Sequence, residues 1–303
     1  MSLIVFLKTV LYGIVEGITE WLPISSTGHL VLLGGVLDLG MSDSFMEMFN
    51  VVIQFGAIMA VVVIYFRKLW PFHTKKKRPG KSWFANPTET GFAGGFQRFA
   101  NNYFYMDKIV LWLKIIVSVL PAVVIGMPLD NTVEKYMYKA VPIALMLIIY
   151  GVLFILIENR NKKREPRVSK IRGITWTDAL IVGLFQVLAI IPGTSRSGAT
   201  IIGGILIGLS RPVAAEYTFY LAIPTMLGAS VLKIAKFGGG LTGTEGAVLA
   251  VGMIVAFLVS IFAIRFLMQY IRRHDFKVFG WYRIVLGILV LILVAAGVLN
   301  NAL

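Results

Sequence analysis

Long apolar blocks, rather than periodic apolar faces, dominate the hydrophobic pattern of this chain. A helix needs roughly 20 apolar residues to cross a hydrocarbon core about 30 Å thick, and several blocks reach that length without a break. The pattern predicts an all-α integral membrane protein that forms a single membrane domain over residues 1–303. Six transmembrane helices are expected, at residues 45–66, 109–129, 138–157, 213–235, 246–270 and 282–302.

Two further apolar segments, residues 2–39 and 175–210, are broken midway by Pro, Gly, Ser and Thr. The breaks are PISSTGH, from Pro23 to His29, and PGTSRSG, from Pro192 to Gly198. Each half is too short to cross a membrane alone. Irregular backbone at membrane depth is tolerated only inside protein or beside a wet cavity, so both segments are predicted to be re-entrant helical hairpins.

The two broken segments resemble each other at a constant offset of 170 positions. Gly13, Glu16, Ser25 and Gly28 in the first correspond to Gly183, Gln186, Ser195 and Gly198 in the second, and Phe49 and Ile53 correspond to Phe219 and Ile223. The chain therefore reads as an internal duplication of a hairpin followed by three spans. Repeat one covers residues 1–157 and repeat two covers residues 174–303.

Composition and charge fit a membrane protein. Charged residues make up 15% of the chain, against about 25% in soluble domains. The net charge of +14 reflects basic residues in three gaps between the apolar blocks, at 67–98, 160–172 and 272–277. This is the positive-inside signal of cytoplasmic loops, so nucleic-acid binding is not expected. The hairpins then enter from opposite faces, which gives an inverted-topology repeat with both termini outside.

The basic gaps also hold aromatic residues and two histidines. The linker 67–107 is expected to be cytoplasmic, and His73 and His274 are expected to be solvated within basic loops. Aromatic residues along the linker indicate a segment lying at the membrane interface, namely Trp70, Trp83, Phe84, Phe92, Phe96 and Phe99.

Glu16 and Glu20 are the first candidates for chemistry. They are four residues apart, so they share one face of a helix, and ionisable groups inside membrane segments are costly and usually functional. Two carboxylates on one face can hold a divalent cation, Mg²⁺ or Ca²⁺, that bridges to phosphate oxygens. The alternative is that Glu20 lies at the interface and Glu16 is a paired structural acid.

The loop from Ser25 to His29 offers hydroxyls and a new helix N-terminus, which together form an anion site. Ser26 is placed to attack phosphorus, with His29 as base or acid. The alternative is that the Ser and Thr residues only cap a half-helix.

Arg196 lies inside the second broken segment, between Ser195 and Ser197. A guanidinium at membrane depth is expensive unless it meets an anion, and its fork matches phosphate oxygens in a bidentate manner. Alternatively, Arg196 pairs with Glu16 or Glu20 for assembly. Both interpretations hold if the ion pair forms in the absence of substrate and opens when a substrate binds. Phosphoryl transfer needs mainly positioning and charge stabilisation, which this set of groups supplies.

Three motifs resemble those of the undecaprenyl-diphosphatase (bacitracin-resistance) family. The run EGITE, Glu16 to Glu20, resembles the family's (E/Q)-x-x-x-E motif. The run PGTSRSGAT, Pro192 to Thr200, fits P-G-x-S-R-S-x-x-T at every fixed position, and PISSTGH is similar to the family's Ser/His loop. The resemblance covers nearly the whole chain. The linker 71–107 is longer than usual in the family, which leaves regulation or partners open.

The resemblance implies hydrolysis of undecaprenyl diphosphate to the monophosphate, at a membrane-embedded site open to the outer face of the bacterial inner (plasma) membrane. This reaction recycles the lipid carrier for cell-wall synthesis, and the family confers bacitracin resistance and depends on a divalent cation. Whether a phosphoserine forms or water attacks directly is left open, as is an oligomeric state. The resemblance implies catalytic Glu20, Ser26, His29 and Arg196, substrate-binding Ser25, Thr27, Gly28, Ser195, Ser197 and Thr200, and metal-binding Glu16 and Glu20.

Two alternatives stand beside this interpretation, namely a transporter and another type of membrane phosphatase. Inverted repeats with broken helices are also a transporter architecture, and the alternative function is a transporter or flippase that moves a lipid phosphate. The acid-phosphatase-like membrane enzymes carry a K-x6-R-P motif. The R-P pairs here, at Arg78 and Arg211, lack the preceding Lys, which excludes that type.

Overall fold

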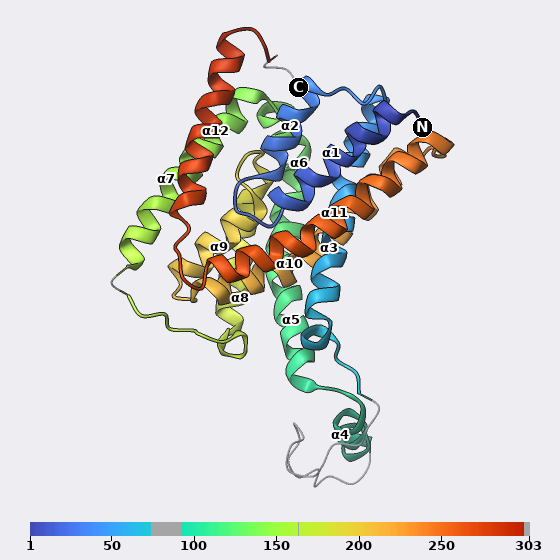
Figure 1. The fold of residues 1–303 in the computed structure, drawn as a ribbon. Helices are drawn as coiled ribbons and strands as arrows, with labels where there is room; N and C mark the ends of the chain where they lie inside the picture. The colour runs from blue at the N-terminus through green and yellow to red at the C-terminus, as the bar shows by residue number, and fades with distance from the viewer. Residues whose placement is uncertain (74–91, 163, 300–303) are drawn as a thin grey trace.

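The computed structural model describes residues 1–73, 92–162 and 164–299, and every regular element within them is helical (Figure 1). Six helices are long and apolar enough to cross a membrane, which confirms the six predicted spans. They are α3 (Asp43–Leu69), α5 continuing into α6 (Met106–Leu129), α7 (Ala140–Asn161), α10 (Arg211–Phe237), α11 (Gly243–Tyr270) and α12 (Lys277–Ala295).

The last span begins and ends earlier than the predicted 282–302. Helix α12 begins at Lys277, because its first turns pack closely against α7. A Cβ atom added to Gly280 would lie 2.7 Å from the carbonyl oxygen of Gly151, so the two backbones are in contact there. The polar and charged start of α12 is thus part of the helical pair, which an apolar window does not detect.

The second span is one crossing in three pieces. Helix α5 (Met106–Pro121) passes into a π-helical turn (Ala122–Gly126) and then into α6 (Met127–Met137). Pro121 cannot donate a backbone hydrogen bond, so it interrupts the regular helical pattern. π-helical structure in proteins occurs mostly as single turns of this kind inside α-helices.

Both broken segments form two short helices joined by a loop. The first comprises α1 (Leu3–Thr19) and α2 (Ser26–Val36). The second comprises α8 (Trp176–Val187), a 3-10 turn (Leu188–Ile190) and α9 (Arg196–Leu206). This is the helix–loop–helix form expected of re-entrant hairpins.

The second helix of each hairpin starts in the same unusual way. Ser25 and Ser195 have φ values of 75° and 70°, and within the described residues they are the non-glycine residues with positive φ. Each serine Oγ accepts the N–H three residues later, from Gly28 at 3.4 Å and from Gly198 at 3.1 Å. An identical strained cap at an offset of 170 is what an internal duplication predicts.

The packing of the helices follows the same relation. Helix α7 packs along α12, α3 along α10, α1 along α11 and α8 along α5. By its order after the hairpin in each half, α5 is the counterpart of α11, so α1 with α11 is the counterpart of α8 with α5. Each hairpin therefore packs against a span of the other half. The pattern is consistent with an inverted repeat, and the division into residues 1–157 and 174–303 stays a prediction.

Glycines at equivalent positions bring each hairpin into backbone contact with its partner span. A Cβ added to Gly13 would lie 2.9 Å from the carbonyl oxygen of Gly252 on α11. A Cβ added to Gly183 would lie 2.3 Å from the carbonyl oxygen of Ser118 on α5. Small residues allow helices to approach closely inside a membrane, so these positions fix where the hairpins dock.

The linker forms a short helix, α4 (Phe92–Tyr103), which projects from the end of the molecule opposite to the start of α1 and the end of α12 (Figure 1). Its Phe96 and Phe99 are more than half exposed, as in an interfacial helix. Trp83 and Phe84 lie outside the described residues. His274 is exposed as predicted, but His73 is partly buried against the Tyr105 ring, 4.7 Å away, so its predicted solvation is wrong.

Candidate active site

Glu20 is the centre of the site. It lies just after α1, buried at 5% exposure, where the first hairpin turns. One carboxylate oxygen accepts a hydrogen bond from the Ser26 hydroxyl at 2.7 Å, and the other accepts from the Arg196 guanidinium at 3.1 Å. Arg196 comes from the second hairpin, 176 residues away. The Glu20 carboxylate therefore links the Ser26 hydroxyl of the first hairpin to the Arg196 guanidinium of the second.

The main chain of Glu20 makes a second link between the hairpins. Its carbonyl oxygen accepts a hydrogen bond from the buried Ser197 hydroxyl at 3.1 Å. The loops 23–29 and 192–198 are thus linked through Glu20, which contacts Ser26 of the first loop and both Arg196 and Ser197 of the second.

Glu16 lies one helical turn before Glu20 and is completely buried. Neither of its carboxylate oxygens has a hydrogen-bond partner in the described part of the chain. Buried polar groups are nearly always satisfied, so an unpartnered carboxyl points to a missing proton partner or a missing cation. The neighbouring acid is Glu20, whose side chain lies within interaction range of the Glu16 carboxyl and also contacts Ser26 and Arg196.

Ser26 is the first residue of α2, but Ser25 provides the cap, because the Ser25 Oγ accepts the Gly28 N–H. The suggestion that Ser26 only caps a half-helix is therefore wrong. Its hydroxyl is directed at Glu20 instead. Thr27 is partly exposed, and its side chain makes no hydrogen bond within the described chain.

His29 faces Tyr282 rather than Ser26. Its Nδ1 lies 2.7 Å from the Ser25 carbonyl oxygen, and its Nε2 lies 2.7 Å from the Tyr282 hydroxyl, with the two rings stacked. A carbonyl oxygen only accepts, so in the neutral ring Nδ1 carries the proton and Nε2 accepts from Tyr282. No hydrogen bond joins His29 to Ser26 in the described structure, and the ionisable side chain that contacts the Ser26 hydroxyl is Glu20.

Arg196 begins α9 and is held by two different acceptors. One terminal nitrogen donates to Glu20, and the other donates to the Thr218 carbonyl oxygen at 3.0 Å. Its Nε is buried without a partner. The expected resting ion pair with a glutamate is present, and the guanidinium keeps unused donor capacity for an incoming anion.

The remaining candidates support the loop around Arg196. The Ser195 and Ser197 hydroxyls lie 3.1 Å apart. Thr200 donates to the Arg196 carbonyl oxygen at 2.9 Å and accepts from the Thr218 hydroxyl at 2.8 Å. These contacts hold the start of α9 against α10, so in this state Thr200 acts through Arg196 and not at the loop surface.

Arg283 joins both loops, although it was not among the site residues predicted from the sequence. It lies on α12, completely buried, and donates to the carbonyl oxygens of Pro23 at 3.2 Å, Gly193 at 2.7 Å and Thr194 at 2.9 Å. Its guanidinium also lies over the Tyr150 ring at 5.5 Å. An arginine inside a predicted span was the available signal, because ionisable residues at membrane depth are usually functional.

Replacing Arg283 with Met should strongly lower the thermal stability of the protein. Three buried carbonyl groups would lose their donor, and each unsatisfied group costs about 1–3 kcal/mol. We expect a clear fall in the apparent Tm in detergent, whereas Arg160→Met, at an exposed position near the end of α7, should leave the Tm unchanged. An unchanged Tm for Arg283→Met would show that the loops hold together without it.

The residues present fit a divalent cation only in part. The described chain contains no group of three or more His, Asp or Glu residues placed to hold a metal. Two carboxylates, Glu16 and Glu20, are available. Mg²⁺ is often held by one or two carboxylates with waters and substrate phosphates supplying the rest, so the pair fits a cation that is shared with a phosphorylated substrate.

Comparisons with known proteins identify the family of the chain. The family model described as bacitracin resistance protein BacA matches residues 9–289. A relative from Enterococcus faecalis, named undecaprenyl-diphosphatase, is 52% identical over 295 residues, covering 97% of this chain and 99% of the relative. Relatives of the same name from Latilactobacillus sakei and Lachnoclostridium phytofermentans are 52% and 53% identical, covering 94% and 96% of this chain and 96% and 97% of theirs. The chain, a multi-pass membrane protein with a two-hairpin polar centre, therefore belongs to the BacA bacitracin resistance family.

Proposed function

We propose that this protein hydrolyses undecaprenyl diphosphate to undecaprenyl phosphate and inorganic phosphate in the bacterial plasma membrane. The observation that carries the reaction type is the direct contact of Glu20 with both the Ser26 hydroxyl and the Arg196 guanidinium. The substrate comes from the name shared by the relatives. The reaction would return the lipid carrier to cell-wall synthesis.

In the first step, the Ser26 oxygen attacks the terminal phosphorus of the diphosphate while Glu20 accepts the hydroxyl proton. A new Ser26 O–P bond forms, and the bond from that phosphorus to the bridging oxygen breaks. Glu20 then gives its proton to the departing undecaprenyl phosphate. The 2.7 Å hydrogen bond between Ser26 and Glu20 supports these roles, because a general base must lie within hydrogen-bond reach of the proton that it removes.

In the second step, water attacks the phosphoserine. Glu20 accepts a proton from the water, the Ser26 O–P bond breaks, and Glu20 returns the proton to the serine oxygen. Arg196 turns from Glu20 to the phosphoryl oxygens and stabilises their charge in both steps. Its unpartnered Nε supports this role, since the donor is available before substrate binds.

Glu16 and Glu20 would hold a divalent cation, which would neutralise phosphate charge when bound. His29 and Tyr282 would hold the Ser25–Ser26 turn in place, because His29 binds the Ser25 carbonyl oxygen. We place the opening of the site toward the outer face, because the first hairpin enters and leaves on the side opposite to the three basic gaps.

Purified protein in detergent should release inorganic phosphate from isoprenyl diphosphates, and a chelator should suppress the release. Detergent removes the two sides of the membrane, so a pure transporter would release no phosphate there. Substrates of several chain lengths would measure the preference for the undecaprenyl chain. Full activity after exhaustive chelation would contradict the role of Glu16 and Glu20 in holding a cation, and no release under any condition would contradict hydrolysis.

A further inference from the structure

A cavity that is separate from the active site lies between the ends of α3 and α11. Its volume is about 770 Å³, and none of the site residues lines it. It combines cationic, aromatic and aliphatic side chains, namely Ile64, Tyr65, Ile264, Arg265, Phe266, Met268, Gln269, Tyr270, Arg272, Arg273 and His274.

Among the residues that the structure describes, no carboxylate pairs with the arginines of this cavity. Arg265, Arg272 and Arg273 are exposed, and their side chains form no ion pair or hydrogen bond within the residues that the structure describes. The neighbouring carboxylate Glu216 is already engaged, since it accepts from Lys68 at 2.8 Å and from the Tyr220 hydroxyl at 2.5 Å. Three arginines at one cavity therefore present positive charge that is not paired within the described part of the chain.

Apolar surface continues from the cavity along the two helices. Val63 and Phe66 on α3, and Phe262 and Phe266 on α11, are all exposed, with Phe262 at 71%. Tyr is enriched at the level of the lipid head groups, and the lining of the cavity contains Tyr65 and Tyr270. The cavity thus offers a charged end for an anionic group and an apolar path for acyl chains.

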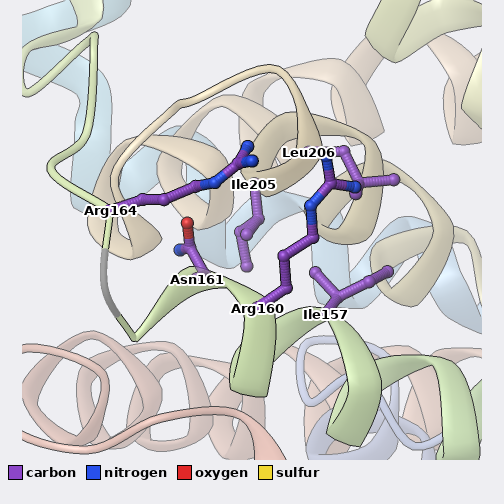
Figure 2. A pocket seen from close by; sticks show the side chains of 6 residues that line it. All are labelled: Ile157, Arg160, Asn161, Arg164, Ile205 and Leu206. Carbon is purple, nitrogen blue, oxygen red and sulfur yellow. The ribbon is translucent and has the colours of Figure 1, made fainter.

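A second basic hollow near the end of α7 provides a contrast (Figure 2). It also contains arginines, but its volume is about 10 Å³, which is close to the space of one water molecule. Its lining residues are Ile157, Arg160, Asn161, Arg164, Ile205 and Leu206. Both hollows are therefore basic, but of the two only the cavity between α3 and α11 has room for a lipid head group.

We propose that the cavity between α3 and α11 binds an anionic phospholipid, with its phosphodiester at Arg265, Arg272 and Arg273 and its acyl chains along the exposed aromatic residues of α3 and α11. Basic pockets between membrane helices on the cytoplasmic side are suited to anionic head groups. The arginine fork matches phosphate oxygens better than a point charge does. The lipid site does not depend on the hydrolytic reaction.

The test is a titration of the full chain in detergent with dioleoyl phosphatidylglycerol, with bound lipid measured by native mass spectrometry. The triple variant Arg265→Gln/Arg272→Gln/Arg273→Gln should bind this lipid on the order of a hundredfold more weakly than the unmodified protein, because each lost arginine removes one favourable phosphate interaction. Phosphate release by the variant should be unchanged, which also shows that it is folded.

The matched control is Arg160→Gln/Lys162→Gln/Arg164→Gln, which removes the same charge from the basic segment beside the small hollow. It should bind phosphatidylglycerol as the unmodified protein does. Equal losses in both triple variants would reduce the effect to surface charge and overturn the proposal. Equal binding of dioleoyl phosphatidylcholine, or displacement of the lipid by inorganic phosphate alone, would overturn the assignment of an anionic lipid.

Discussion

Ser26→Ala should reduce phosphate release by about a thousandfold or more while leaving thermal stability nearly unchanged. The expected stability follows from the contacts, since Ser25 caps α2 and the Ser26 hydroxyl has no such role. Ser26→Asn should be equally inactive, because an amide can accept hydrogen bonds but cannot attack phosphorus. Phosphate release and the apparent Tm should be measured on the same preparations.

Glu20→Gln tests the partner of the serine. Glutamine keeps an oxygen that can accept a hydrogen bond from Ser26, but it cannot take the proton, so activity should fall as far as in Ser26→Ala. The double variant Ser26→Ala/Glu20→Gln should lose hardly more activity than either single variant, because residues that act as a unit fail together.

An active Ser26→Asn variant would overturn the assignment of Ser26 as the nucleophile. A trapped phosphoserine would exclude direct attack of water on the substrate.

His29 provides an internal comparison. It contacts Tyr282 and the Ser25 carbonyl oxygen instead of the Ser26 hydroxyl. The effects of His29→Ala and Ser26→Ala should therefore be closer to additive than those of Glu20→Gln and Ser26→Ala. Complete non-additivity between His29 and Ser26 would restore the proton-transfer role that the sequence suggested for His29.

Arg196→Lys should lower phosphate release by roughly a hundredfold to a thousandfold, although the charge is kept. Arg196 uses separate nitrogens for Thr218 and Glu20, and a lysine ammonium cannot reproduce this fork. Losing one well-placed donor to transition-state charge costs about that much. The rate should be measured at saturating substrate, because the loss is expected in the chemical step.

Arg211→Lys is the matched control. Arg211 also forms a partly buried ion pair, with two of its nitrogens on the carboxylate of the buried Glu158, but it does not contact the loops. Its replacement should lower the apparent Tm and leave the rate per folded molecule unchanged. Near-normal turnover of Arg196→Lys would remove the phosphate clamp from the mechanism.

The spans and the broken segments could be predicted because apolar length and helix-breaking residues are local properties of the chain. The contact of Arg196 with a glutamate could also be anticipated, since a buried cation needs an anion and few acids lie at membrane depth. These inferences need residue type and approximate depth, and they do not need the detailed placement of helices.

The partner of Ser26 could not be predicted in the same way. Glu20 and His29 are both close to Ser26 in sequence, and the choice between them depends on Tyr282, which lies 253 residues from His29 and holds its ring. Arg283 was missed for a related reason. Its partners are backbone carbonyl groups, and every residue has one, so no residue type in either loop marks the contact.

The exchange of hairpins between the two halves has a consequence for synthesis on the ribosome. The Ser260 hydroxyl of α11 donates to the Gly17 carbonyl oxygen of α1 across 243 residues. At about 5–20 residues per second, α1 waits roughly 10–50 s for α11 to be translated. Until then the glycine face of α1 and the neighbouring Glu16 lack their final covering helix. The active site is therefore completed late, and a nascent chain that stops before α11 has no functional first hairpin.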